Sequence, residues 1–195
     1  DLKAPDGDGW KVLLGGLHAG VCLLAPLLIA VIASRVTEIE RAGNGWLLFA
    51  ASGTTPGQLC RAKFLALGAP LAAVCVLWGL CVPVWGALLG VPAPVPTGRI
   101  VAYTASVCVI SLVILALQLL ILASDNQLLA VGAGMLGVLL SMIGVMAPTW
   151  AQYLTPWTYY SLVAPMTFTG SDPVYLDAPF PGALVLAIAG AVAFT

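Results

Sequence analysis

Long apolar runs separated by polar breaks set the pattern of this chain. Five runs contain no Asp, Glu, Lys or Arg: residues 12–34, 64–89, 100–123, 128–147 and 182–195. A membrane-spanning helix needs about 20 consecutive apolar residues. The first four runs therefore each predict a spanning helix, and the last predicts the start of another. We expect the second helix to begin before its apolar run, near Pro56.

The polar breaks between these runs differ in length and character. Residues 35–63 form a long charged break, and residues 90–99 form a short, proline-rich one. Residues 124–127 read as a tight turn, whereas residues 148–181 are long, aromatic and dense in proline. The pattern predicts an all-α, polytopic membrane protein in which residues 1–195 form a single transmembrane domain.

Composition supports the membrane assignment and excludes several other classes. Hydrophobic residues make up 61% of the chain and charged residues 8%, whereas soluble domains carry about 25% charged residues. The mean hydropathy is +1.06. A net charge of −1 provides no basic field for a nucleic-acid partner. Five cysteines without a C-x-x-C pair, together with a single histidine, argue against a zinc site and predict no bound metal.

Basic residues are unevenly divided between the two sides of the membrane. If the loops alternate, one side carries four basic residues: Arg35, Arg41, Arg61 and Lys63. The other side carries three: Lys3, Lys11 and Arg99. The positive-inside rule then places the 35–63 break in the cytoplasm and the N-terminal segment outside. If the true N-terminus is cytoplasmic, a further span precedes residue 1, which gives six spans with both termini inside.

The 35–63 break contains a charged helix followed by an apolar patch. Arg35, Glu38 and Arg41 are spaced i, i+3, i+6, so on a helix they can pair along one face while Glu40 points elsewhere. Residues 43–45 (Gly-Asn-Gly) interrupt the helix, and a short apolar patch follows at residues 46–49, Trp-Leu-Leu-Phe. Two interpretations remain open: a solvated juxtamembrane loop with a tryptophan anchor, or a docking surface for a partner.

The next helix has a recognisable start within the same break. Thr55 precedes Pro56, which is the order expected for an N-cap followed by proline at the first helical position. We therefore expect a helix to run from Pro56 through Arg61 and Lys63 into the second span.

Aromatic residues gather in the 148–181 break. Trp150, Tyr153 and Trp157 fall at i, i+3 and i+7, and Tyr159 and Tyr160 follow. Amphipathic aromatics collect at membrane interfaces whatever the function of the protein. The alternative is a re-entrant pair of short helices that caps a transport path from outside, in which Pro156 fixes the backbone and aims the indole of the next residue.

Small and polar residues inside the runs predict how the helices pack. Small residues recur at i, i+4 in two runs, as Gly16 with Gly20 and as Gly137 with Ser141. Such pairs let helices approach closely, within the subunit or, as the alternative, at a dimer seam. His18 and Gln118 are the ionisable and amide groups within the spans. We expect hydrogen-bonded packing for both, with a proton relay and a polar lining as the respective alternatives.

The order of these features resembles the permease subunits of the ABC-2 transporter superfamily. Those permeases show a glutamate-bearing segment, a Gly/Asn break, an aromatic, a leucine pair, a proline-containing turn and a basic residue that opens the next span. The matching features here are Glu38/Glu40, Gly43–Gly45, Trp46, Leu47–Leu48, Thr54–Gly57 and Arg61/Lys63. The stretch "YLTPWTYYSLVAP" at Tyr153–Pro165 is similar to the proline–tryptophan motif of the bacterial lantibiotic-protection permeases.

The resemblance implies a specific architecture and set of roles. The fold would be a six-span ABC-2 permease, type V exporter-like, with the first span missing from this sequence and the last one cut short. The implied coupling segment that docks on the ATPase comprises Arg35, Glu38, Glu40, Arg41, Trp46, Leu47 and Phe49. The implied external gate, or else aromatic belt, comprises Trp150, Tyr153, Pro156, Trp157 and Tyr160. The helix-packing residues are Gly16, Gly20, Gly137 and Ser141.

The resemblance also implies partners, a cargo and a location. The chain has no G-x-x-x-x-G-K-[ST] phosphate-binding loop, so ATP and Mg would be bound by a separate ATP-binding subunit, and this chain would bind no cofactor and carry no catalytic residue. Two permease copies, identical or paralogous, would form a dimer in the bacterial cell membrane as a multi-pass protein. The expected cargo is a hydrophobic or amphipathic compound such as a lantibiotic. The rival interpretations are a non-transporting assembly or sensor subunit and, third, a membrane enzyme.

The topology is directly testable with an impermeant thiol reagent in intact cells. Cysteine introduced at Asn44 should resist labelling, and cysteine introduced at Ser171 should be labelled, because the first position is expected inside and the second outside. The unsubstituted chain, with its five native cysteines, sets the background. Labelling at position 44 but not at position 171 would reverse the orientation.

Overall fold

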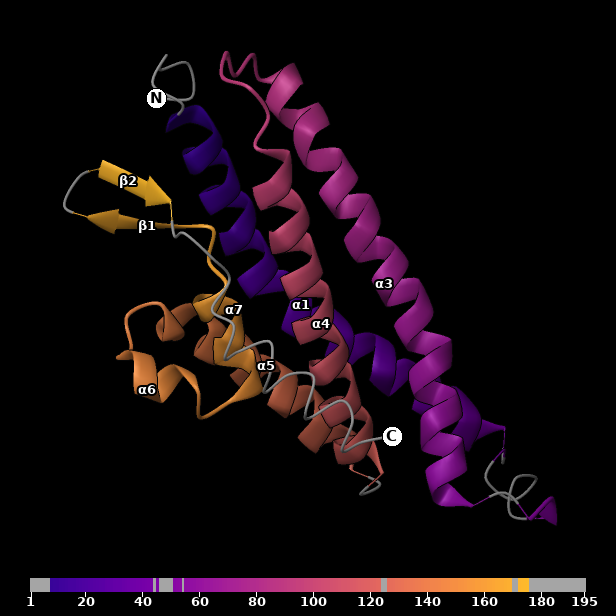
Figure 1. The fold of residues 1–195 in the computed structure, drawn as a ribbon. Helices are drawn as coiled ribbons and strands as arrows, with labels where there is room; N and C mark the ends of the chain where they lie inside the picture. Colours follow the sequence, from indigo (N-terminus) through magenta and orange to yellow (C-terminus); the bar gives the residue numbers. More distant parts are fainter. Residues whose placement is uncertain are drawn as a thin grey trace.

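A computed structural model describes residues 8–43, 45, 51–53, 55–123, 126–169 and 172–175. Its four long helices are α1 (Asp8–Ala42), α3 (Pro56–Leu88), α4 (Thr97–Leu122) and α5 (Gln127–Gly144), which lie side by side in an elongated bundle (Figure 1). All four are long and apolar enough to cross a membrane. The predicted helical, polytopic membrane protein is confirmed to this extent. The predicted run at 182–195 lies outside the described residues.

Helices α1 and α3 are longer than a bilayer requires. With 35 residues at about 1.5 Å each, α1 spans about 52 Å, against a hydrocarbon core of about 30 Å. Helix α3 has 33 residues. Helix α1 continues through the charged residues 35–42 that were predicted to form a helix, and α3 begins at Pro56 as predicted. Both helices are therefore longer than an untilted span requires, and the charged residues of α1 lie at the end from which the chain continues to α3.

The start of α3 is fixed by a capping box. The backbone N–H of Gln58 donates to Thr55 Oγ1 over 3.3 Å, and the backbone N–H of Thr55 donates to Gln58 Oε1 over 3.0 Å. Each bond satisfies an N–H that would otherwise lack a partner at a helix start. Pro56 at the first helical position has no N–H to satisfy. The predicted cap is confirmed, and the side chain of Gln58 completes it.

Helix α4 is the central element of the bundle. Its inner face carries Ile110 and Ile114, both fully buried, and Tyr103, Leu115 and Leu119, each at most 5% exposed. Helices α1, α3 and α5 pack around α4, whereas α3 leaves most of its apolar side chains exposed. Exposed apolar side chains on a spanning helix are expected where the solvent is lipid.

Short elements follow α5 in place of another long helix. Helix α6 (Thr149–Gln152), the 3-10 helix η1 (Pro156–Thr158) and helix α7 (Tyr159–Leu162) fold back against the bundle, as Figure 1 shows. The antiparallel strands β1 (Met166–Thr169) and β2 (Asp172–Tyr175) come next and lie beside the N-terminal half of α1. The all-α prediction did not include this hairpin, because two four-residue strands are too short to show a period-2 pattern.

Small residues on α5 allow close helix packing, as predicted for Gly137 and Ser141. A Cβ at Gly137 would collide with the indole of Trp157, and a Cβ at Gly134 would collide with the side chain of Ala30. A Cβ at Gly16 or Gly20 would meet no described atom within 4 Å. Close packing within the subunit, predicted for both pairs, is therefore found on α5 but not on α1.

These contrasts predict a matched pair of glycine substitutions. Gly137→Ala should destabilise the chain by about 1–3 kcal/mol, because the added methyl overpacks a filled interior. Gly16→Ala should be neutral or slightly stabilising, since alanine is the better helix former and space is open. Thermal unfolding of the purified chain in detergent measures both. Equal losses for the two variants would mean that the α1 glycine face is covered as tightly as the α5 face.

Candidate functional site

The end of α1 carries the charged helix that the sequence predicted. Arg35 Nη1 donates to Glu38 Oε2 over 2.9 Å, and both side chains are largely exposed, at 71% and 46%. This confirms the predicted pairing of Arg35 with Glu38 along one face. The side chain of Arg41, the third member of the predicted row, lies outside the described residues. An exposed ion pair of this kind contributes little to stability.

A second ion pair at this end connects two different helices. Glu40 of α1 pairs with Lys63 of α3, and their side chains are only 28% and 15% exposed. Glu40 therefore does point away from the Arg35–Glu38 row, as predicted, and its partner is on the neighbouring helix. A partly buried ion pair is less screened by solvent than an exposed one. The Glu40–Lys63 pair between α1 and α3 is therefore stronger than the Arg35–Glu38 pair within α1.

The break after the charged helix agrees with the sequence. Helix α1 ends at Ala42, and the N–H of Gly43 closes its last turn on the carbonyl of Ile39 over 3.1 Å. The predicted apolar docking patch, with Trp46, Leu47 and Phe49, lies outside the described residues. Residues 35–43 and 55–63, called the α1–α3 end from here on, flank that stretch in sequence and lie within the described part of the chain.

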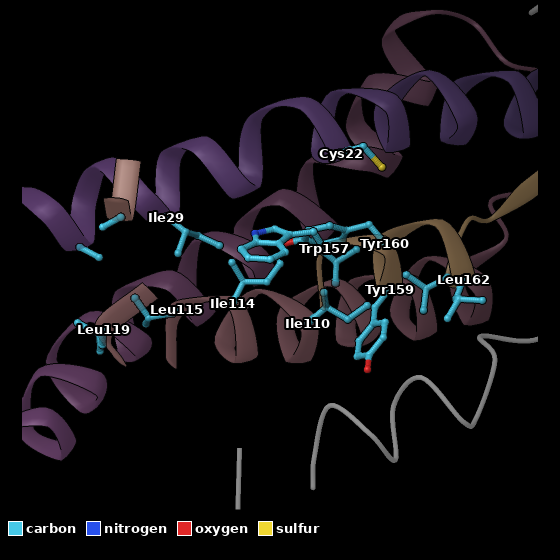
Figure 2. Close-up of a cluster of buried hydrophobic side chains, with 14 of the residues drawn as sticks. Cys22, Ile29, Ile110, Ile114, Leu115, Leu119, Trp157, Tyr159, Tyr160 and Leu162 are labelled. Atoms are coloured by element: carbon cyan, nitrogen blue, oxygen red, sulfur yellow. The ribbon is translucent and has the colours of Figure 1, made fainter. Parts of the chain in front are cut away.

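The segment from η1 to α7 reaches the middle of the bundle. The hydroxyl of Tyr160, which is fully buried, lies 2.9 Å from Ser111 Oγ near the middle of α4. Figure 2 shows the indole of Trp157 next to Ile114, with Ile29 on the α1 side. The short elements between residues 149 and 162, called the re-entrant segment from here on, fold back against α4 and α5. Irregular backbone of this kind is tolerated at membrane depth only where protein or water surrounds it.

Side chains bind the backbone carbonyls that the breaks leave free. After α5, Gln152 Nε2 donates to the carbonyls of Gly144 and Ala147 over 2.7 and 2.9 Å. The hydroxyl of Thr158 lies 2.6 Å from the carbonyls of both Gln152 and Thr155. Non-helical backbone in a low-dielectric interior needs such partners, because an unpaired carbonyl is costly there. The re-entrant segment is therefore held by its own polar side chains.

Two serines join the re-entrant segment to α5. Ser141 Oγ lies 2.8 Å from the carbonyl of Gly137 and 3.0 Å from that of Trp157, and Ser161 Oγ donates to the carbonyl of Ser141 over 3.2 Å. Ser141 was predicted as a small packing residue. Its hydroxyl also makes hydrogen bonds, which the spacing of small residues could not show.

The predicted aromatic residues differ in their exposure to solvent. Trp150 is 70% exposed, whereas Trp157 is 8% exposed and Tyr160 is fully buried. The i, i+3, i+7 spacing does not form one helical face, because α6 ends at Gln152 and η1 begins at Pro156. Trp150 has the exposure that an interfacial belt requires. Burial in the core argues against a belt position for Trp157 and makes it a structural anchor of the re-entrant segment.

His18 packs in a buried polar contact between α1 and α4. Its Nδ1 lies 3.0 Å from the hydroxyl of Tyr103, and its Nε2 lies 3.5 Å from Cys22 Sγ. The two rings meet edge to face with centroids 5.7 Å apart. The predicted hydrogen-bonded packing is therefore confirmed for His18. The sequence did not indicate Tyr103 as its partner, since the two residues lie 85 positions apart.

Gln118 departs from its predicted role. Its side chain is fully buried in the bundle, yet within the described part of the chain neither Nε2 nor Oε1 has a hydrogen-bond partner. The predicted interhelical hydrogen bond is therefore not formed between protein groups there.

The described residues offer no obvious metal centre. Within them, no group of three His, Cys, Asp or Glu side chains is arranged to hold a metal ion. Comparison with family models, curated proteins and solved structures gave no match. The described residues form helices long and apolar enough to span a membrane, with an ion pair that joins α1 to α3 and a buried segment, η1 to α7, against α4 and α5.

The Glu40–Lys63 contact should contribute measurably to stability, unlike the exposed pair. Lys63→Met should lower the free energy of unfolding by about 1 kcal/mol, the upper value for ion pairs that keep some solvent contact. The double exchange of Glu40→Lys with Lys63→Glu should recover part of that loss. Glu38→Gln, which breaks the exposed Arg35 pair, serves as the control and should change little. The free energy of unfolding, measured in detergent at low and high salt, tests this expectation. Equal losses for Lys63→Met and Glu38→Gln would contradict a stronger Glu40–Lys63 pair.

Proposed function

We propose that this chain is the membrane-spanning subunit of an ATP-driven ABC exporter of the ABC-2 type. Its cargo would be a hydrophobic or amphipathic compound, such as a lantibiotic or another membrane-active peptide or drug. The observation that carries the proposal is the Glu40–Lys63 ion pair, which joins two helices long enough to span a membrane at the end where the sequence continues into the predicted docking patch.

The α1–α3 end has the properties that a coupling surface needs. A partner that moves this end would displace both helices together, because the Glu40–Lys63 ion pair joins them there. Charged residues on the exposed face of α1, with Arg35 and Glu38 in a solvent-facing pair, suit the polar rim of an interface. The patch that begins at Trp46 would supply the central apolar anchor, which is where most binding energy is concentrated.

The re-entrant segment supports a transport role over a purely anchoring one. Broken helices that reach the membrane midplane are found where a membrane protein lines or closes a path. Here Trp157 and Tyr160 lie against α4 and α5, and Gln152 and Thr158 satisfy the broken backbone. In the proposed exporter this segment closes the outer end of the path.

The remaining parts of the transporter would come from other chains. ATP and Mg would be bound by a separate ATP-binding subunit, and a second permease copy or a paralogue would complete a dimer. The site of action would be the bacterial cell membrane, from which the cargo is removed. The second candidate is a non-transporting assembly or sensor subunit, which the same exposed charged end would also suit.

Association with an ATPase tests the proposal and separates it from the second candidate. The tagged full chain, purified from its own membranes, should bring down an ATP-hydrolysing subunit. Trp46→Ala should weaken that association about 30-fold, since the loss of an anchor aromatic costs about 2 kcal/mol. Trp150→Ala, at an exposed position outside the α1–α3 end, should leave it unchanged. Recovery of the chain with partners that lack ATPase activity would favour the assembly or sensor role.

A further inference from the structure

The junction of α1, α4, α5 and η1 contains buried polar atoms that no described residue satisfies. They are Nε2 and Oε1 of Gln118 and Nε1 of Trp157. Gln118 is 0% exposed and Trp157 is 8% exposed, so neither group can turn to bulk water. Buried donors and acceptors in folded proteins nearly always have a partner, which is bound water where protein groups are lacking.

Both groups border the same strip of α5. A Cβ at Gly134 would lie 3.6 Å from Gln118 Nε2, and a Cβ at Gly137 would collide with Trp157 Nε1. Residues three apart on a helix are neighbours on one face. The Gln118 amide and the Trp157 indole nitrogen therefore lie near Gly134 and Gly137 on one face of α5. Neither glycine has a side chain that would lie between the two groups.

Helix α1 contributes a third polar group to this junction. The Cβ position of Gly134 also lies 3.5 Å from the carbonyl oxygen of Pro26 and against the side chain of Ala30. Pro26 lies inside α1 and has no N–H, so the carbonyl of Cys22, one turn earlier, loses its helical donor. Cys22 is 2% exposed. An acceptor without its helical donor thus lies one turn from the contact between α1 and α5.

We propose that one or two water molecules occupy this junction and hydrogen-bond the Gln118 carboxamide, the Trp157 indole N–H and the Cys22 carbonyl. Water fits the set because it both donates and accepts, and these neutral groups offer donors (Nε2 and Nε1) as well as acceptors (Oε1 and the carbonyl). A buried water makes about three hydrogen bonds. Helices α1 and α4 and η1 would each supply one bonding group, and the glycines of α5 would border the water.

A double-mutant cycle tests the bridge through the unfolding temperature of the purified full chain in detergent. Gln118→Leu should lower that temperature by roughly 2–4 °C, as expected for one lost contact in a chain of this size, because it leaves the other two groups without their shared partner. Trp157→Phe should also lower it. In the Gln118→Leu background the effect of Trp157→Phe should be smaller, since the bridging water is already lost.

Trp150→Phe is the matched control, because Trp150 is exposed and lies outside the junction. Its effect should be the same with and without Gln118→Leu. A rise in unfolding temperature with Gln118→Leu would mean that the carboxamide is buried dry, and would overturn the proposal. Strictly additive effects of the two junction substitutions would also overturn it. If Gln118→Leu does not accumulate in the membrane, Gln118→Met replaces it, because methionine has nearly the shape of glutamine. A fall in unfolding temperature then supports the proposal and a rise overturns it.

Discussion

Every part of this bundle depends on the requirement that backbone groups inside hydrocarbon find partners within the protein. The long helices meet it mainly through their own i to i−4 bonds, which are interrupted at the prolines inside α1 and α3. The segment after α5 cannot, because its helices α6, η1 and α7 are each four residues or shorter. Gln152 and Thr158 therefore bind the freed carbonyls, and Ser141 and Ser161 close the contact with α5. The fold is thus a helical frame into which one irregular segment is fastened by short polar side chains.

The helical frame could be predicted from the sequence because hydrocarbon selects for long apolar runs and caps mark their ends. The four described spans, the start of α3 at Pro56 and the Arg35–Glu38 pair are all local features. A run of about 20 apolar residues, a Thr-Pro step and an i, i+3 spacing each act within a few turns of chain. Such signals survive without any knowledge of the tertiary structure.

The contacts between distant segments could not be predicted, since no local spacing encodes them. Glu40 with Lys63, His18 with Tyr103 and Ser111 with Tyr160 each join different elements. The aromatic spacing at Trp150 and Trp157 also did not show which of the two is buried, because the helix breaks between Gln152 and Pro156. On α1, the small residues at Gly16 and Gly20 suggested close packing, but spacing cannot tell which face of a helix meets a neighbour.

The glycine-lined face of α5 is covered by side chains that come later in the sequence. Gly137 and Gly144 lie under Trp157 and under Thr158 and Ser161, all of which are synthesised after α5 itself. Tyr160 further requires Ser111 on α4. The buried position of this segment therefore depends on contacts from both α4 and α5. A chain that ended before residue 156 would leave Gly137 and Gly144 without the side chains that cover them.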